Sequence, residues 1–81
     1  MKLTDKNTLR QLQGDMVLVV IDGEEFLYTI VHFINGENHS LELSDRTKKP
    51  KDRGENVPIT QAILDNLVPV KHEKAKWKLV L

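Results

Sequence analysis

The middle of the chain alternates between apolar, β-branched runs and turn dipeptides. Residues 16–21 and 26–34 are two such runs, and residues 37–44 alternate polar with apolar positions. Asp22-Gly23 separates the first run from the second, and Asn35-Gly36 separates the second from the third. These dipeptides favour two-residue hairpin turns, because their residues tolerate positive φ. The pattern predicts a three-stranded antiparallel meander.

Taking both turns as two-residue loops fixes the register of the two hairpins. Val19 then faces Phe26, and His32 faces His39. Directly opposed residues share a face of the sheet, and both turns independently place apolar side chains on the same face. We expect that face to be the core layer. Its members are Val17, Val19, Ile21, Phe26, Tyr28, Ile30, Leu41 and Leu43.

The opposite face of the meander is apolar on its first two strands and polar on the third, at Ser40, Glu42 and Ser44. A sheet coiled toward a small SH3-like barrel would produce this pattern, and so would a flat meander with a helix or a second subunit on its back. A soluble monomer rarely leaves such a patch bare, so a helix of this chain or a partner should cover it. The expected partner surface consists of Leu18, Val20, Leu27, Val31 and Phe33.

A short helix is expected before the meander. Leu9 and Leu12 are three positions apart, as on one helix face, and Thr4 or Asp5 can serve as the N-cap. Gly14 follows where a left-handed terminator belongs. An irregular lead-in strand is the alternative reading, and the capping pattern favours the helix.

Residues 57–67 predict a second helix, with Ile59, Ile63 and Leu67 at helical spacing. Pro58 suits a position just before or inside the first turn, and Thr60 suits the cap.

The end of the chain, residues 75–81, alternates like a strand, with Trp77, Leu79 and Leu81 on one side. We expect it to pair at an edge of the sheet, because an apolar chain end needs such an anchor. Residues 45–57 show no periodicity and predict a loop. Together, residues 1–81 predict a single α+β domain.

Composition narrows the class of protein. The chain has 81 residues, 40% hydrophobic and 30% charged, which is typical of a globular domain rather than a disordered one. It has no Cys, which excludes disulfides and thiolate metal sites. No apolar segment is long enough to span a bilayer, and the first residues do not resemble a signal peptide, so we expect a cytoplasmic protein.

The net charge of zero hides an asymmetry between the halves of the chain. Residues 1–44 carry three basic and seven acidic residues, a net of −4, and residues 45–81 carry nine and five, a net of +4. The split indicates either an interaction surface or two halves that attract each other on folding. The second interpretation is favoured, since most of these charges fall in turns and loops.

Catalytic and metal-binding patterns are missing from the sequence. His32 and His39 face each other in the predicted register, and His72 or Glu37 could complete a metal site, but zinc needs three or four well-spaced ligands. Two partly exposed histidines at the rim of the core layer are the favoured interpretation. Ser40 lies on a regular strand rather than at a nucleophile elbow. We therefore expect no enzyme, no metal and no cofactor.

Two basic segments suggest a nucleic-acid surface as the alternative function. One lies in the long loop and the other surrounds the single Trp, and small barrels bind nucleic acid through basic faces with stacking aromatics. Interleaved acidic residues and a pI of 6.8 favour a solvated loop instead. The residues concerned are Lys48, Lys49, Lys51, Arg53, Lys76, Trp77 and Lys78.

The second predicted helix carries a resemblance. Pro58-Ile59-Thr60-Gln61-Ala62-Ile63-Leu64 is similar to the Pro-Leu-Thr-x-x-Ile/Trp-Leu segment of short uncharacterised proteins from phages and mobile elements of gut bacteria. Those proteins also begin a β-rich stretch with a Gly-Asp or Gly-Asn step, as at Gly14-Asp15. Their Gly-Phe after the helix is replaced here by Leu67-Val68-Pro69. The resemblance implies a mobile-element origin and no particular activity.

The expected function is non-enzymatic binding to another protein, for example as a phage-encoded modulator, with a homodimer as one possibility. A small-barrel nucleic-acid binder is the alternative.

Overall fold

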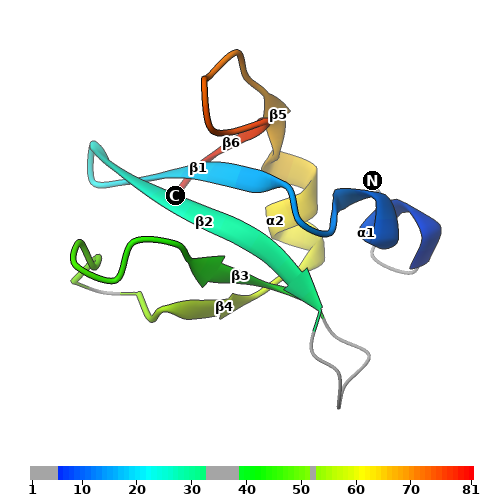
Figure 1. Ribbon diagram of the computed structural model, residues 1–81, viewed down its shortest axis with the longest axis horizontal. Coiled ribbons are helices and arrows are strands. Elements are labelled where there is room, and N and C mark those ends of the chain that lie inside the picture. The colour runs from blue at the N-terminus through cyan, green and yellow to red at the C-terminus, as the bar shows by residue number, and fades with distance from the viewer. Residues whose placement is uncertain (1–5, 33–38, 52) are drawn as a thin grey trace.

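The computed structural model describes residues 6–32, 39–51 and 53–81, which form six strands and two short helices (Figure 1). All six strands belong to one mixed sheet with the order β4-β3-β2-β1-β6-β5. In chain order the elements are α1 (Lys6–Leu12), β1 (Met16–Ile21), β2 (Glu24–His32), β3 (His39–Leu43), β4 (Asn56–Pro58), α2 (Gln61–Asn66), β5 (Val68–Pro69) and β6 (Trp77–Val80).

Both central hairpins have the register that the turn dipeptides predict. Val19 pairs with Phe26 between β1 and β2, and His32 pairs with His39 between β2 and β3. The first turn has positive φ at both central residues, 51° at Asp22 and 79° at Gly23, as a two-residue hairpin turn requires. The second turn, with Phe33 and Asn35-Gly36, lies outside the described residues.

The sheet is open, so the predicted SH3-like barrel is not formed. Strands β4 and β5 are its two edges, and the three predicted strands are the central part of a larger mixed sheet. The prediction of an edge position for the last strand was also wrong. Strand β6 lies between β1 and β5 and runs parallel to β1, with Val19 opposite Leu79. Alternation identifies a strand but not its neighbours, which long-range packing decides.

The long loop ends earlier than its composition indicates. Residues Asn56–Pro58 form edge strand β4, in which Val57 pairs with Leu41 of β3. Pro58 is tolerated there because an edge strand leaves one row of N–H groups unpaired. Helix α2 therefore begins after Pro58, and the predicted cap is confirmed: Thr60 Oγ1 accepts a hydrogen bond from Ile63 N at 3.3 Å.

The predicted first helix is confirmed as α1, and it ends against the sheet. Gly14 has φ of 90°, the left-handed conformation that favours glycine after a helix. Its N–H donates to the Ile30 carbonyl at 2.8 Å, so the end of α1 is bonded directly to β2.

Both helices contribute to a single core on one side of the sheet. In Figure 1, α2 lies behind β1 and β2 and connects the β4 edge to the β5 edge. The predicted core layer is confirmed, with Ile21 at its margin, and Trp77 also packs against it. The helices and their flanking residues add Leu9, Leu12, Ile59, Ile63, Leu64 and Leu67, and β6 adds Leu79.

Candidate functional site: the open face of the sheet

The face of the sheet that is turned away from this core is also apolar. Leu18 of β1 pairs with Leu27 of β2, and Val20 of β1 pairs with Val80 of β6, so these side chains share one face. They alternate along each strand with the residues that point into the core. We call this surface the open face. Its apolar members are Met16, Leu18, Val20, Leu27, Val31, Val68 and Val80.

The open face is separate from the hydrophobic core. None of its seven apolar residues belongs to the described core cluster or packs against it. Leu18 at the centre is only 8% exposed, whereas Val68 is 50% and Val80 is 62% exposed on the outer strands. The remaining four are half-buried. The apolar surface therefore continues from β2 to the β5 edge and meets water at its margin.

The described helices do not cover this face. The buried side chains of α1, Leu9 and Leu12, and those of α2, Ile63 and Leu64, all belong to the core cluster on the other side. Within the described residues, neither short helix covers the second face of the meander.

Four of the five residues predicted as a partner surface lie together on the open face. These are Leu18, Val20, Leu27 and Val31; the fifth, Phe33, lies outside the described residues. The sequence reasoning missed Val68 and Val80. Val80 alternates with Lys76 and Lys78 and was identifiable as facing away from Trp77, but its place beside Val20 depends on the parallel pairing. A two-residue strand such as β5 carries no pattern at all.

Charged and polar residues border the open face asymmetrically. Glu42 lies on β3, where it pairs with Thr29, and Glu25 of β2 pairs with Val20 next to the β1–β2 turn. On the other side, Lys78 of β6 pairs with Leu18. The Thr29 and Ser44 hydroxyls are 2.8 Å apart and hydrogen-bond each other, whereas the buried Ser40 hydroxyl on the same face has no hydrogen-bond partner among the described residues.

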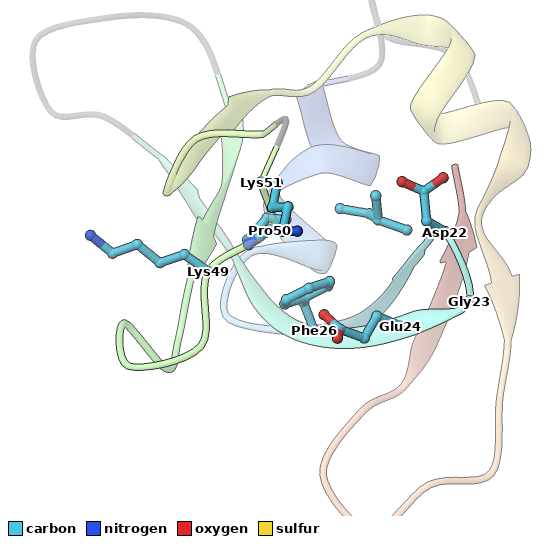
Figure 2. Close-up of a pocket in the computed structure, with 8 residues that line it drawn as sticks. Asp22, Gly23, Glu24, Phe26, Lys49, Pro50 and Lys51 are labelled. Atoms are coloured by element: carbon cyan, nitrogen blue, oxygen red, sulfur yellow. The ribbon is translucent and has the colours of Figure 1, made fainter.

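A pocket lies on the core side of the sheet, at the β1–β2 turn (Figure 2). This pocket has a volume of about 520 Å³ and an apolar part formed by Ile21, Phe26 and Pro50. Its charged lining comes from the turn residues Asp22 and Glu24 and from Lys49 and Lys51 of the long loop.

Figure 2 shows the Lys49 side chain extending away from the pocket, and its Nζ forms an ion pair with Glu55. Lys48 Nζ lies 5.2 Å from the centroid of the Phe26 ring, a cation–π contact from the same loop. Among the described residues, the lining contains no His, Ser, Thr or Tyr, so its described part presents acids and amines without an adjacent hydroxyl nucleophile or imidazole base.

The predicted histidine pair is formed, but its two members differ in exposure. The rings of His32 and His39 have centroids 4.6 Å apart at an interplanar angle of 33°. His32 is exposed, whereas His39 is 8% exposed, and neither His39 ring nitrogen has a hydrogen-bond partner among the described residues. Burial, and secondarily the charge of His32, lower the pKa of His39 below its ordinary value. The expectation that both histidines would be partly exposed was therefore wrong for His39.

No third ligand joins this pair within the described residues. No group of three or more His, Asp or Glu suited to a metal ion occurs among them, and Glu37 lies outside them. His72 is in the β5–β6 connection, where its Nδ1 accepts a hydrogen bond from Lys74 N at 3.1 Å.

The two basic segments belong to different elements. Lys48, Lys49 and Lys51 lie in the loop after β3, whereas Lys76 and Lys78 are at β6, and β2 and β1 lie between β3 and β6 in the sheet. Several of these cations have acidic partners: Lys49 pairs with Glu55, and Lys76 Nζ lies 3.5 Å from Asp15 Oδ1.

Trp77 is not free to stack on a base either. Its Nε1 donates to Asp15 Oδ2 at 3.1 Å, and its ring packs against the core. Arg53, in the same loop as Lys48, Lys49 and Lys51, is exposed. Burial raises the pKa of the Tyr28 hydroxyl, and the positive charge of Arg53 lowers it. That hydroxyl donates to the Gly54 carbonyl at 3.2 Å.

Neither described helix is long and apolar enough to cross a membrane. Comparison of the chain with protein families, curated proteins and solved structures gives no match.

Proposed function

We propose that this protein is a non-enzymatic binding protein that docks another protein on its open face. The observation that supports the proposal is a sheet face with seven apolar residues, distinct from the core, over which neither described helix packs. Contiguous apolar surface of this kind marks interaction sites in soluble proteins, because its exposure to water is unfavourable.

The partly exposed valines give a rough scale for the gain on docking. Fully burying an aliphatic side chain is worth about 1.5–3 kcal/mol relative to full exposure. Val68 and Val80 are 50% and 62% exposed in the free chain. Each can therefore contribute roughly 1–2 kcal/mol when a partner covers it. Leu18 is only 8% exposed, so it gains little further burial when a partner docks.

A nucleic-acid-binding function has weaker support. Lys49 and Lys76 already have acidic partners, and Trp77 packs against the core. Affinity for single-stranded DNA at low salt, lost steeply as salt is raised, would favour that function over the one proposed here.

Site-specific photo-crosslinking tests the proposal. A benzophenone amino acid replaces half-buried Val20 on the open face in one full-length variant, and exposed Ala62 on α2 in the other. In lysate of the source cells, we expect discrete crosslinked products from position 20 and not from position 62. Excess wild-type chain should suppress these products, and excess Val80→Glu should not. The same products from both positions, or none from position 20, would contradict the proposal.

A further inference from the structure

The paired histidines His32 and His39 end the β2–β3 ladder on the core side of the sheet. They lie directly opposite each other, two positions beyond the core pair Ile30 and Leu41, so all four side chains share one face. The pair is therefore separate from the open face, and a role for it is independent of the proposed function.

His39 combines burial with unpaired ring nitrogens. It is 8% exposed, and neither nitrogen has a hydrogen-bond partner among the described residues. Buried polar atoms without partners destabilise a folded protein, and where they persist they often bind an ion or have another functional role. A neutral imidazole carries a lone pair on one nitrogen, which makes histidine the commonest metal ligand among the side chains.

The backbone of His39 is held on both sides. On one side it pairs with His32 of β2, and on the other its carbonyl accepts a hydrogen bond from Ile59 N at 3.0 Å. The position of His39 is thus set before any ligand arrives, which lowers the entropic cost of binding. His32 is exposed, so its ring can change rotamer and an ion can reach the pair from that side.

The distance between the two rings fits a shared metal ion. Their centroids are 4.6 Å apart, and their planes are inclined by 33°. A metal ion about 2.0–2.1 Å from an imidazole nitrogen lies about 3.2 Å from the centre of that ring. Two imidazoles at right angles on one ion therefore have centroids about 4.5 Å apart, and at the tetrahedral angle about 5.2 Å. The observed separation matches the first arrangement without movement of either strand.

We propose that His32 and His39 together bind a divalent transition-metal ion such as Cu²⁺, Ni²⁺ or Zn²⁺, with water in the remaining coordination positions. Imidazole nitrogens suit these ions, and Cu²⁺ should bind most tightly of the three. Mg²⁺ and Ca²⁺ prefer oxygen ligands and should not compete. A closed structural zinc site needs more protein ligands, and no third one joins this pair among the described residues. The site is therefore open, and its affinity is moderate.

Isothermal titration calorimetry of the full chain with Cu²⁺ tests the proposal. We expect saturable binding to the wild type. Binding to His32→Gln and to His39→Leu should be at least about tenfold weaker, since each variant loses one of the two ligands. His72→Gln removes the histidine of the β5–β6 connection and is the matched control, with no change expected. Mg²⁺ should not bind in the same way.

Nitrogen NMR of the imidazole rings identifies the ligands directly, because Zn²⁺ is diamagnetic. Zn²⁺ should shift the ring nitrogens of His32 and His39 and leave those of His72 unchanged. It should also raise the Tm of the wild type, because the ion binds the folded pair, and not that of His32→Gln. His32 is exposed, so this variant keeps the core intact, and circular dichroism verifies that each variant is folded.

Three outcomes would overturn the metal site: no saturable Cu²⁺ binding at millimolar concentration, an unchanged affinity in His32→Gln, or an equal loss in His72→Gln. None of them alters the crosslinking expected from position 20 on the open face. The two proposals therefore fail separately.

Discussion

Trp77 and Asp15 are joined by a hydrogen bond across 62 positions of sequence: the indole Nε1 donates to the carboxylate Oδ2 at 3.1 Å. The other carboxylate oxygen, Oδ1, lies 3.5 Å from Lys76 Nζ. Asp15 immediately precedes β1 and Trp77 is the first residue of β6, so one carboxylate connects the beginnings of two parallel strands.

Replacing this carboxylate should therefore weaken the attachment of β6. Asp15→Ala removes the acceptor and leaves the indole N–H without its partner, at an expected loss of about 1–2 kcal/mol in the free energy of unfolding. Asp15→Asn keeps an acceptor and loses only the ion pair to a lysine whose side chain is 76% exposed, so its cost should be below about 0.5 kcal/mol. Urea denaturation followed by Trp77 fluorescence measures both. Equal losses in the two variants would show that the hydrogen bond is not the stabilising contact.

Burial of His39 makes stability depend on pH. Its pKa is lowered in the folded protein, first by burial and then by His32, so the unfolded chain takes up the proton more readily. Stability should be constant with respect to this group well above pH ~6.5, the unfolded value, and should decrease as the pH falls below it. The decrease should stop below the folded pKa, where both states carry the proton. Thermal unfolding between neutral and mildly acidic pH measures the slope.

Two variants separate His39 from the other histidines. His39→Leu should flatten the pH dependence and remain stable at neutral pH, because it replaces two ring nitrogens, which have no hydrogen-bond partner in the described part of the chain, with apolar atoms. His32→Gln removes the neighbouring charge and leaves the burial, so most of the slope should remain. A slope that is unchanged in His39→Leu would assign the pH dependence to another group.

The cap of α2 should contribute measurably to stability, since this helix has only six residues. Thr60→Ala removes the oxygen that accepts the hydrogen bond from Ile63 N, and the expected cost is about 1 kcal/mol. Thr60→Ser retains the oxygen and should cost much less. Chemical denaturation of the two variants decides, and a similar cost for both would assign the effect to the methyl group.

Adjacent positions on β6 should respond very differently to truncation. Leu79 is 0% exposed in the core, so Leu79→Ala should cost about 2–5 kcal/mol. Val80 is 62% exposed on the open face, so Val80→Ala should change the stability of the monomer by less than about 0.5 kcal/mol. Chemical denaturation of both variants separates the core from the docking surface. Comparable losses would mean that Val80 is buried by this chain itself.

The elements that sequence predicts well here are those determined by neighbouring residues. The turn at Asp22-Gly23 and the alternation around it specify the pairing of β1 with β2, and through it the face on which Leu18 and Leu27 lie together. The α2 cap at Thr60 is local in the same sense.

The remaining features depend on residues that are distant in sequence. Strands β4 and β5 are too short to carry a periodic signal, and they exist because β3 and β6 supply their hydrogen-bond partners. The position of β6 beside β1 follows from the packing of Trp77 and Leu79 against the core rather than from any local pattern. The strand pattern places His39 at the rim of the core layer, but it does not predict that His39 is buried there. Val80 lies on the open face because the parallel pairing sets it opposite Val20, and the sequence does not predict this pairing.

The parallel pairing of β1 with β6 also has a consequence for the order of folding. Hairpins form early because their loops are short, whereas β1 and β6 must find each other across most of the chain. Until β6 docks, the apolar strand β1 is an unpaired edge and not an interior strand, and such edges recruit other chains. The insertion of Trp77–Val80 therefore protects the nascent protein from aggregation at its most hydrophobic strand.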